Sequence, residues 1–567
     1  MQNKNIPAKC LYLRSPESGH SDSAEFRPDE RNIMIGYRNN TKETVMEFSG
    51  NTYGRTAKRC IPAIAALLCL CISFSASAFS DGSREAAGRA TASKAQKYAG
   101  AMLDDPAFRN ASVSILAVTA AGDTLLDINR ERYMLPASTM KLFTTALALR
   151  VLGEDYRFKT SVGYSGTITG GRLEGDLYII GGGDPTMCGT RNETGPVFSE
   201  WLGFLKSAGI REITGYVIGD GRCFPEMPEQ GSWEMDDTGT YYGAGATGLA
   251  FAENTVSFDV SPGQSPGAPL KIKPSYPETP WMRYVYSCTT GPKGSGNSLY
   301  LYTTRNSVIA EMHGTLAEDR KQTIEMTANK FPEYTCAYHF AEYLKNNGIS
   351  CGKGPADLGF VFSPAEKEKG WKPEAQKNLS VLGTTMSKKL SDIVFITNME
   401  SNNLYAEAML KTAARAYSGE GTYGAAYLAK NSFMKKLGIG TGGLVQVDGS
   451  GLSRQNMVTA DFICRLLKTM LDAPESSSYI NSLPRPGYDG TLKHIMPDAP
   501  ASDRMRIRMK SGTMSGVRCF SGYIMPAENS DGDAVVFSIM VNNFDAPNKK
   551  IQSKINELTE ILAGYNR

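Results

Sequence analysis

One apolar segment constrains the fold of this 567-residue chain more than any other, because it is continuous enough to predict a helix without ambiguity. No glycine or proline interrupts the run from Thr139 to Leu152, and its residues are mostly apolar or small. The pattern predicts a helix that begins at about Thr139. Ser138 then stands at the N-terminal end of this helix, and Lys141, three positions later, lies on the same face.

Ser138 has two candidate roles at this position. A serine before a helix is ordinarily its N-cap, and on this spacing alone the cap is the more common role. The alternative is a nucleophile with Lys141 as its base, since burial can lower the pKa of a lysine toward neutrality. The helix N-terminus also favours developing negative charge. The spacing by itself leaves both roles open.

Histidine is too scarce to supply the usual base of a serine hydrolase or a metal site. Beyond residue 78 the three histidines, His313, His339 and His494, lie far apart, and the chain has no C-x-x-C. A zinc site is not expected from these ligands, and no cofactor is expected. Any base beside Ser138 is therefore expected to be a residue other than histidine.

Composition limits the partners and the number of domains. The chain has 61 Lys and Arg against 58 Asp and Glu, a net charge of +3, and no long basic run interleaved with aromatic residues. Nucleic acid is therefore not an expected partner. At about 150 residues per domain, a chain of this length is expected to hold several domains.

An export signal is predicted at residues 56–78. Arg55, Lys58 and Arg59 precede or open the apolar run CIPAIAALLCLCISF, and SASA then supplies an A-x-A cleavage site. The mature chain would begin at Phe79, in the periplasm. An uncleaved anchor is the weaker alternative, because the run is shorter than the roughly 20 residues of a membrane span.

The residues before this signal, 1–55, form a poorly patterned extension. We attribute it to a start codon assigned too far upstream, with Met46 or Met34 as the initiator. Beyond residue 78 the number of cysteines is odd, so in an oxidising compartment at least one is expected to stay free or to pair between chains.

Two further motifs favour catalysis over capping. The run SNN supplies Ser401, Asn402 and Asn403 at another predicted helix start, and the run KSGT begins at Lys510 on a predicted strand. S-x-x-K, S-D-N and K-T-G motifs build the active site of penicillin-binding proteins and class A β-lactamases. Each motif is weak alone, but the ordered set on an exported chain resembles this superfamily.

Three glycine-bearing stretches narrow the resemblance to one family. By local rules GGGDPT and DGSGLS are turns. Together the stretches resemble class C low-molecular-mass penicillin-binding proteins, the D-alanyl-D-alanine carboxypeptidase/endopeptidases, from about Arg84 to the C-terminus. Two departures, Ser511 for the usual threonine and Asn402 at a variable position, keep the side-chain chemistry. The stretches are GGGDPTM at 181–187, VDGSGLSRQN at 447–456 and PGYDGTL at 486–492.

The resemblance implies an α/β (α+β) fold of the penicillin-binding protein/β-lactamase-like transpeptidase type. The chain between Ser138 and Ser401 is much longer than in small members of the superfamily, which implies large inserted domains. Short apolar runs between Gly and Pro turns predict mostly β structure there, and in this family such an insertion forms two domains. The expected catalytic domain is discontinuous, at residues 84–160 and 376–567, around an insertion at 161–375.

Local patterns predict individual elements of the catalytic parts. SVSILAVTAAGDTLLDIN predicts a hairpin that turns near Ala121, SGYIMP and AVVFSIMVNNF predict later strands, and IQSKINELTEILAGY predicts a terminal helix. In RMRIRMK, strict alternation predicts a strand. It places Arg504 and Arg506 on a solvated face, with Met505 and Met509 as core residues.

The resemblance also implies a role for each motif residue. Ser138 is the expected nucleophile and Lys141 its base. Ser401 is expected to relay the proton to the leaving amine, and Asn403 to orient the lysine and the substrate amide. Backbone N–H groups of Ser138 and Thr513 would form the oxyanion hole. The expected substrate-binding residues on the predicted strand are Lys510, Ser511, Gly512 and Thr513.

One acidic residue outside the motifs is a candidate determinant of substrate specificity. Asp237, in GSWEMDDTGTYYGAG, resembles the acidic position through which this family's inserted region meets the amino group of the substrate's diamino-acid side chain. The alignment leaves Asp236 as an alternative. The run DDTG is also typical of a plain turn with solvated carboxylates, so both interpretations stay open.

These features together predict a serine-type D-alanyl-D-alanine carboxypeptidase/endopeptidase that cleaves peptidoglycan stem peptides through an acyl-serine intermediate. β-Lactam antibiotics are the expected inhibitors. The alternatives are a β-lactamase, which must deacylate quickly, and a catalytically silent cell-wall-binding protein. The oligomeric state and the balance between carboxypeptidase and endopeptidase activity stay open.

Overall fold

The computed structural model describes residues 88–359, 361–372, 379–436, 438–528 and 532–565. The predicted signal peptide and the extension before it lie outside the described residues. Within the described ranges, no helix combines the length and the apolar character that a membrane crossing requires.

An antiparallel sheet of five strands lies at the centre of the part of the chain that carries the motifs. Its strands are β1 (Ser112–Thr119), β2 (Thr124–Ile128), β20 (Ile507–Met514), β21 (Val517–Ile524) and β22 (Val535–Asn542). Their order is β2-β1-β22-β21-β20, so β20 forms one edge. The predicted hairpin is β1 and β2, and the two predicted later strands are β21 and β22, so these predictions are confirmed.

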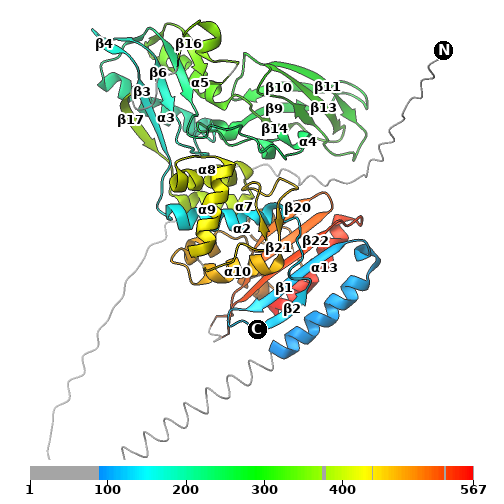
Figure 1. The fold of residues 1–567 in the computed structure, drawn as a ribbon. Coiled ribbons are helices and arrows are strands. Elements are labelled where there is room, and N and C mark those ends of the chain that lie inside the picture. The colour runs from blue at the N-terminus through cyan, green and yellow to red at the C-terminus, as the bar shows by residue number, and fades with distance from the viewer. Residues whose placement is uncertain (1–87, 360, 373–378, 437, 529–531, 566–567) are drawn as a thin grey trace, which may run out of the picture. The chain divides into compact units, whose positions relative to one another are not determined.

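Helices pack against both faces of this sheet (Figure 1). The helices of this part of the chain are a helix at residues 88–104, α2 (Met140–Leu152), α7 (Leu390–Glu400), α8 (Asn403–Ser418), α9 (Tyr423–Lys436), α10 (Ala460–Leu471), α11 (Ser476–Asn481), α12 (Ala501–Arg506) and α13 (Asn548–Ala563). One hydrophobic core joins the sheet to α2, α8 and α10, and the other joins it to the first helix and α13. The predicted apolar helix is α2, which is buried from Met140 to Leu149.

The chain between α2 and α7 forms sheets and helices of its own. Its elements are β3 (Lys159–Tyr164), β4 (Thr167–Thr169), β5 (Arg172–Glu174), β6 (Leu177–Ile180), α3 (Arg191–Ser207), β7 (Glu212–Ile213), β8 (Tyr216–Asp220), α4 (Met235–Thr238), β9 (Thr255–Ser261), β10 (Lys271–Tyr276), β11 (Arg283–Gly291), β12 (Tyr300–Tyr302), β13 (Ile309–Ala317), β14 (Thr323–Ala328), α5 (Pro332–Asn346), β15 (Ser350–Cys351), β16 (Gly354–Asp357), α6 (Pro364–Lys367) and β17 (Ser380–Met386).

A five-stranded sheet with the strand order β16-β8-β6-β3-β17 contains both the first strand of this segment, β3, and the last, β17, which pair with each other. Helices α3 and α5 share a hydrophobic core with this sheet. Strands β9, β11, β12 and β13 share a second core. Strands thus form much of the segment, as expected, whereas the long helices α3 and α5 were not predicted. The domain boundaries stay a prediction.

The residues before Ile507 form a helix rather than the predicted strand. Arg504 and Arg506 belong to α12, and β20 begins only at Ile507. Arg506 does not face solvent: its side chain is 10% exposed and donates to the carbonyl oxygen of Ala563 at the end of α13. Met505, predicted as a core residue, is 45% exposed. Alternation over so few residues does not distinguish the two conformations, and the contact with α13 favours the helix.

Candidate active site

Ser138 lies in a 3-10 turn, η2 (Ala137–Thr139), directly before α2. It does not cap the helix, because Thr139 occupies the N-cap position and makes no side-chain capping bond. The Ser138 hydroxyl instead accepts a hydrogen bond from Lys141 Nζ at 3.0 Å. Ala137 has a φ of 43°, a left-handed conformation that is rare outside glycine and gathers at functional sites. The helix-cap alternative is therefore wrong.

Lys141 is completely buried, and its Nζ has two further acceptors besides the serine hydroxyl. It donates to Asn403 Oδ1 at 2.6 Å and to the carbonyl oxygen of Ser450 at 2.8 Å. Burial lowers the pKa of Lys141 to about 7, although the negative charges of Glu407 and Asp448 act in the opposite direction. An amine with such a pKa exchanges its proton near neutral pH, as a general base must.

Ser401 and Asn403 come from the connection between α7 and α8. Ser401 ends α7 in the left-handed conformation, with φ at 60°, and Asn402 caps α8. The Asn403 side-chain amide lies between two groups, because its Oδ1 accepts from the buried lysine and its Nδ2 donates to the carbonyl oxygen of Tyr242 at 2.8 Å. Ser401 Oγ accepts from Lys510 Nζ at 2.9 Å. The site therefore contains a second serine–lysine pair.

Gly512 lets the edge strand β20 approach the turn that holds Ser138. A Cβ atom at Gly512 would lie 2.5 Å from the carbonyl oxygen of Pro136 and 3.1 Å from the backbone nitrogen of Thr139. A larger residue would therefore displace either the strand or the turn. Steric crowding at this position requires glycine in the KSGT run, and the sequence alone did not show this requirement.

The other residues of this run differ in burial and contacts. Lys510 is completely buried, and burial together with the charge of the neighbouring lysine lowers its pKa. The Ser511 hydroxyl lies 3.2 Å from the hydroxyl of Thr491, in the stretch PGYDGTL. Thr513 is exposed, and its hydroxyl accepts a hydrogen bond from Arg518. The strand thus presents two hydroxyl groups that solvent or a substrate can reach.

Asp237 is half-buried in α4, whereas Asp236 is exposed. The Asp237 carboxylate accepts from the Tyr242 hydroxyl at 3.2 Å, and burial raises its pKa. This segment contacts the motif region through Trp233, whose indole N–H donates to Asp448 at 2.9 Å. Asp237 is therefore not a freely solvated turn residue, and its role in substrate choice stays a prediction.

Two buried carboxylates beside the site were not predicted. Glu407 on α8 and Asp448 in the stretch VDGSGLSRQN are both 0% exposed. They hold the loop at 448–453, whose Ser450 carbonyl contacts the buried lysine. A glutamate in the otherwise apolar run LYAEAML was the available sequence signal, because such residues are rarely buried without a partner.

The described residues contain no group of three or more His, Cys, Asp or Glu side chains arranged to hold a metal ion. The seven cysteines that the structure describes are free thiols.

Comparison with known proteins identifies relatives over most of the chain. The model of the D-Ala-D-Ala carboxypeptidase 3 (S13) family matches residues 95–562. A D-alanyl-D-alanine carboxypeptidase of Actinomadura sp. (strain R39) is 31% identical over 460 residues, which cover 79% of this chain and 80% of the relative. Penicillin-sensitive carboxypeptidase A of Dictyostelium discoideum is 27% identical over 477 residues, 78% of this chain and 84% of the relative.

A solved structure shows the same fold. Penicillin binding protein 4 (dacB) of Haemophilus influenzae matches with a TM-score of 0.68 and 21% identity, over 81% of this chain and 97% of that one. Another structure of that protein, complexed with a novel β-lactam, matches with a TM-score of 0.62. At this identity the likeness concerns the fold, and the predicted fold class is confirmed.

Proposed function

The chain belongs to the D-Ala-D-Ala carboxypeptidase 3 (S13) family, and from this premise we propose that Ser138 is the nucleophile of a serine-type D-alanyl-D-alanine carboxypeptidase acting on peptidoglycan stem peptides. The observation that carries the proposal is the contact between Ser138 Oγ and Lys141 Nζ at 3.0 Å, inside a site where the lysine is completely buried. A base must lie within hydrogen-bond reach of the proton that it removes.

Acylation then follows from the contacts of these residues. Ser138 Oγ attacks the carbonyl carbon of the penultimate D-Ala, while neutral Lys141 takes the hydroxyl proton. Backbone N–H groups of Ser138 and Thr513 stabilise the negative charge on the carbonyl oxygen. Ser401 donates its hydroxyl proton to the nitrogen of the leaving D-Ala and takes the proton that Lys141 holds, so the C–N bond breaks and Lys141 is neutral again. Water then hydrolyses the acyl-serine and restores the free hydroxyl.

The remaining site residues orient the reactants. Asn403 fixes Lys141 through its Oδ1, and its own amide is fixed by the carbonyl of Tyr242. Lys510 donates to Ser401, which supports a role of this pair in the proton relay. The charge of Lys510 and the hydroxyls of Ser511 and Thr513, which follow it on the edge strand, are proposed to hold the terminal carboxylate of the substrate.

Two further parts of the proposal concern the side chain of the substrate and the cellular location of the enzyme. Asp237 is proposed to bind the free amine of the stem peptide's diamino acid, because a half-buried carboxylate with a raised pKa gains from a cationic partner. Residues 56–78 are proposed to be a cleaved signal peptide that delivers the enzyme to the periplasm. N-terminal sequencing of the exported protein is expected to begin at Phe79, and a sequence that begins before Arg55 would contradict this.

Intact-protein mass spectrometry with a penicillin tests the nucleophile. One penicilloyl adduct is expected on the wild type and none on Ser138→Ala. Ser478→Ala, the same substitution at a serine that contacts Glu154 instead, is the matched control and should keep the adduct. An adduct that persists in Ser138→Ala would refute the assignment.

A digest of purified muropeptides then tests the reaction. Release of D-Ala is expected, and cleavage of cross-linked dimers would add endopeptidase activity. Rapid turnover of a chromogenic cephalosporin without release of D-Ala would favour a β-lactamase, and binding without either reaction would favour a silent wall-binding protein.

A further inference from the structure

Glu407 is a buried carboxylate that the acylation steps above do not use. It lies on α8, one helical turn after Asn403, and is 0% exposed. Its oxygens accept hydrogen bonds from two consecutive backbone N–H groups, those of Gly449 at 2.9 Å and Ser450 at 2.7 Å. Burial of a carboxylate is costly, so hydrogen bonds of this kind are what allow the charge to remain there. Glu407 thereby holds the first part of the loop at 448–453.

Asp448 holds the rest of the same loop. It accepts from the backbone N–H groups of Gly451 at 2.8 Å and Ser453 at 2.6 Å. The two buried carboxylates thus bind four backbone N–H groups within six residues, and the Ser450 carbonyl is left to accept from Lys141 Nζ at 2.8 Å. The position of this carbonyl is therefore set by groups that lie outside the reacting atoms.

The Ser450 carbonyl determines where the lone pair of Lys141 points. A neutral amine has two N–H donors and one lone pair. Asn403 Oδ1 at 2.6 Å and the Ser450 carbonyl at 2.8 Å accept both N–H groups, which leaves the lone pair for the Ser138 hydroxyl at 3.0 Å. If the Ser450 carbonyl moved away, the amine could donate an N–H to Ser138, and in that orientation it could not accept the serine proton.

We propose that Glu407 is a positioning residue of this active site, which holds the Ser450 carbonyl so that neutral Lys141 presents its lone pair to Ser138. The inference rests on the proposed function and deepens it. Glu407 is completely buried, and the hydrogen bonds described for it with the loop join the backbone N–H groups of Gly449 and Ser450, so it acts through the loop backbone.

Glu407 also contributes to the charge balance around Lys141. Its negative charge raises the pKa of Lys141 against the larger effect of burial. Burial and the charge of Asp448 raise the pKa of Glu407 itself. Removing the Glu407 charge therefore lowers the pKa of Lys141 and leaves more of the neutral base at acid pH. The other titratable groups that face this pair are Asp448, Lys411, Tyr423, Glu226 and Lys510.

Glu407→Gln tests this role, because glutamine keeps the shape of the side chain but removes the charge and turns an N–H group toward the loop amides. The rate constant for penicilloyl formation on Ser138 is measured across the acid and neutral pH range. The plateau rate is expected to fall ~10- to 100-fold, as for lost hydrogen bonds to a charged group. The midpoint of the acid limb is expected to move to lower pH.

Glu407→Asp separates the effect of side-chain length from the effect of charge. Aspartate keeps the negative charge but is one methylene shorter, so it cannot hold both loop N–H groups from the same place on α8. The plateau is expected to fall, and the midpoint is expected to stay near that of the wild type.

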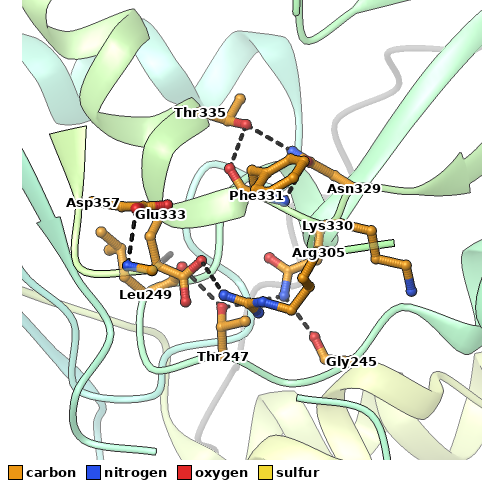
Figure 2. A network of polar contacts seen from close by, with 12 residues as sticks. Gly245, Thr247, Leu249, Arg305, Asn329, Lys330, Phe331, Glu333, Thr335 and Asp357 are labelled. Carbon is orange, nitrogen blue, oxygen red and sulfur yellow. Dashed lines mark hydrogen bonds and ion pairs between the residues drawn. The ribbon is translucent and has the colours of Figure 1, made fainter. Parts of the chain in front are cut away.

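Glu333→Gln is the matched control, the same substitution at another buried carboxylate. Glu333 is 8% exposed, and Figure 2 shows its carboxylate directed toward Arg305, with 3.7 Å between the charged atoms. This variant is expected to change the melting temperature while keeping both the plateau and the midpoint of the wild type.

An unchanged plateau in Glu407→Gln would overturn the inference. A lowered plateau with an unmoved midpoint in Glu407→Gln would also overturn it, because removing the charge that raises the pKa of Lys141 must move the midpoint. If Glu407→Gln does not fold, Glu407→Asp decides, and a wild-type plateau in that variant overturns the proposal. A wild-type enzyme that forms no adduct on Ser138 would instead refute the proposed function, so the two failures are distinguishable.

Discussion

Acylation of Ser138 by a penicillin is expected to accelerate about tenfold between pH 6 and pH 8. The group that sets this dependence is Lys141, whose pKa burial lowers to about 7. Only the neutral amine can take the serine proton, so the reactive fraction rises with pH. That fraction is about one tenth at pH 6, about half at pH 7 and about nine tenths at pH 8, since each pH unit changes the ratio of the two forms tenfold.

Histidine titrates in the same range and must be separated from the lysine. Among the hydrogen bonds that the structure describes for Ser138 and Lys141, none involves a histidine. His494 is the histidine nearest in sequence to the motifs and follows Thr491, which contacts Ser511. His494→Gln is therefore the control, and its midpoint is expected to equal that of the wild type.

Quenched-flow mass spectrometry at saturating penicillin measures the rate constant directly, because the adduct adds a known mass. Melting temperatures over the same pH range show that the fold is intact. A rate that stays flat or falls between pH 6 and pH 8 would refute neutral Lys141 as the base. A midpoint that disappears in His494→Gln would assign the titration to the histidine instead.

Three substitutions extend these predictions. Lys141→Arg is expected to lower the acylation rate by about 10²- to 10⁴-fold, the usual contribution of a general base, because a guanidinium keeps its proton in this pH range. Adduct formation near the wild-type rate at pH 8 would contradict this. Asp237→Asn is expected to weaken cleavage of peptides with a free side-chain amine by about 1.5–3 kcal/mol in competition assays, with little change in penicillin acylation. Equal losses toward both would point to displacement of the segment whose Tyr242 carbonyl holds Asn403. Gly512→Ala is expected to lower the acylation rate roughly tenfold or more, because its Cβ would lie 2.5 Å from the Pro136 carbonyl oxygen and shift the turn that carries Ser138. A rate within about twofold of the wild type would show that the turn can adjust.

The sequence by itself determined the secondary-structure elements and motifs that depend on residues close together in the chain. The run from Thr139 to Leu152 has no helix breaker, so α2 and the position of Lys141 on the face of Ser138 followed from local preference. The hairpin β1–β2 and the helix α13 followed from periodicity in the same way. The ordered motifs indicated the superfamily and the three glycine-bearing stretches indicated the family, because each of these signals occupies only a few consecutive residues.

Only the tertiary structure decided which groups meet in the site. Asn403 and Ser450 are 262 and 309 positions from Lys141, yet both accept from its Nζ. The exclusion of Ser138 as a helix cap, the burial of Glu407 and the helical conformation of Arg506 also depend on packing between distant segments. Secondary-structure preference is a property of short stretches, whereas the pKa of a side chain and its hydrogen-bond partners depend on the whole environment that folding places around it. The residue types of the candidate site are therefore visible in the sequence, and the lowered pKa of Lys141 follows only from the folded protein.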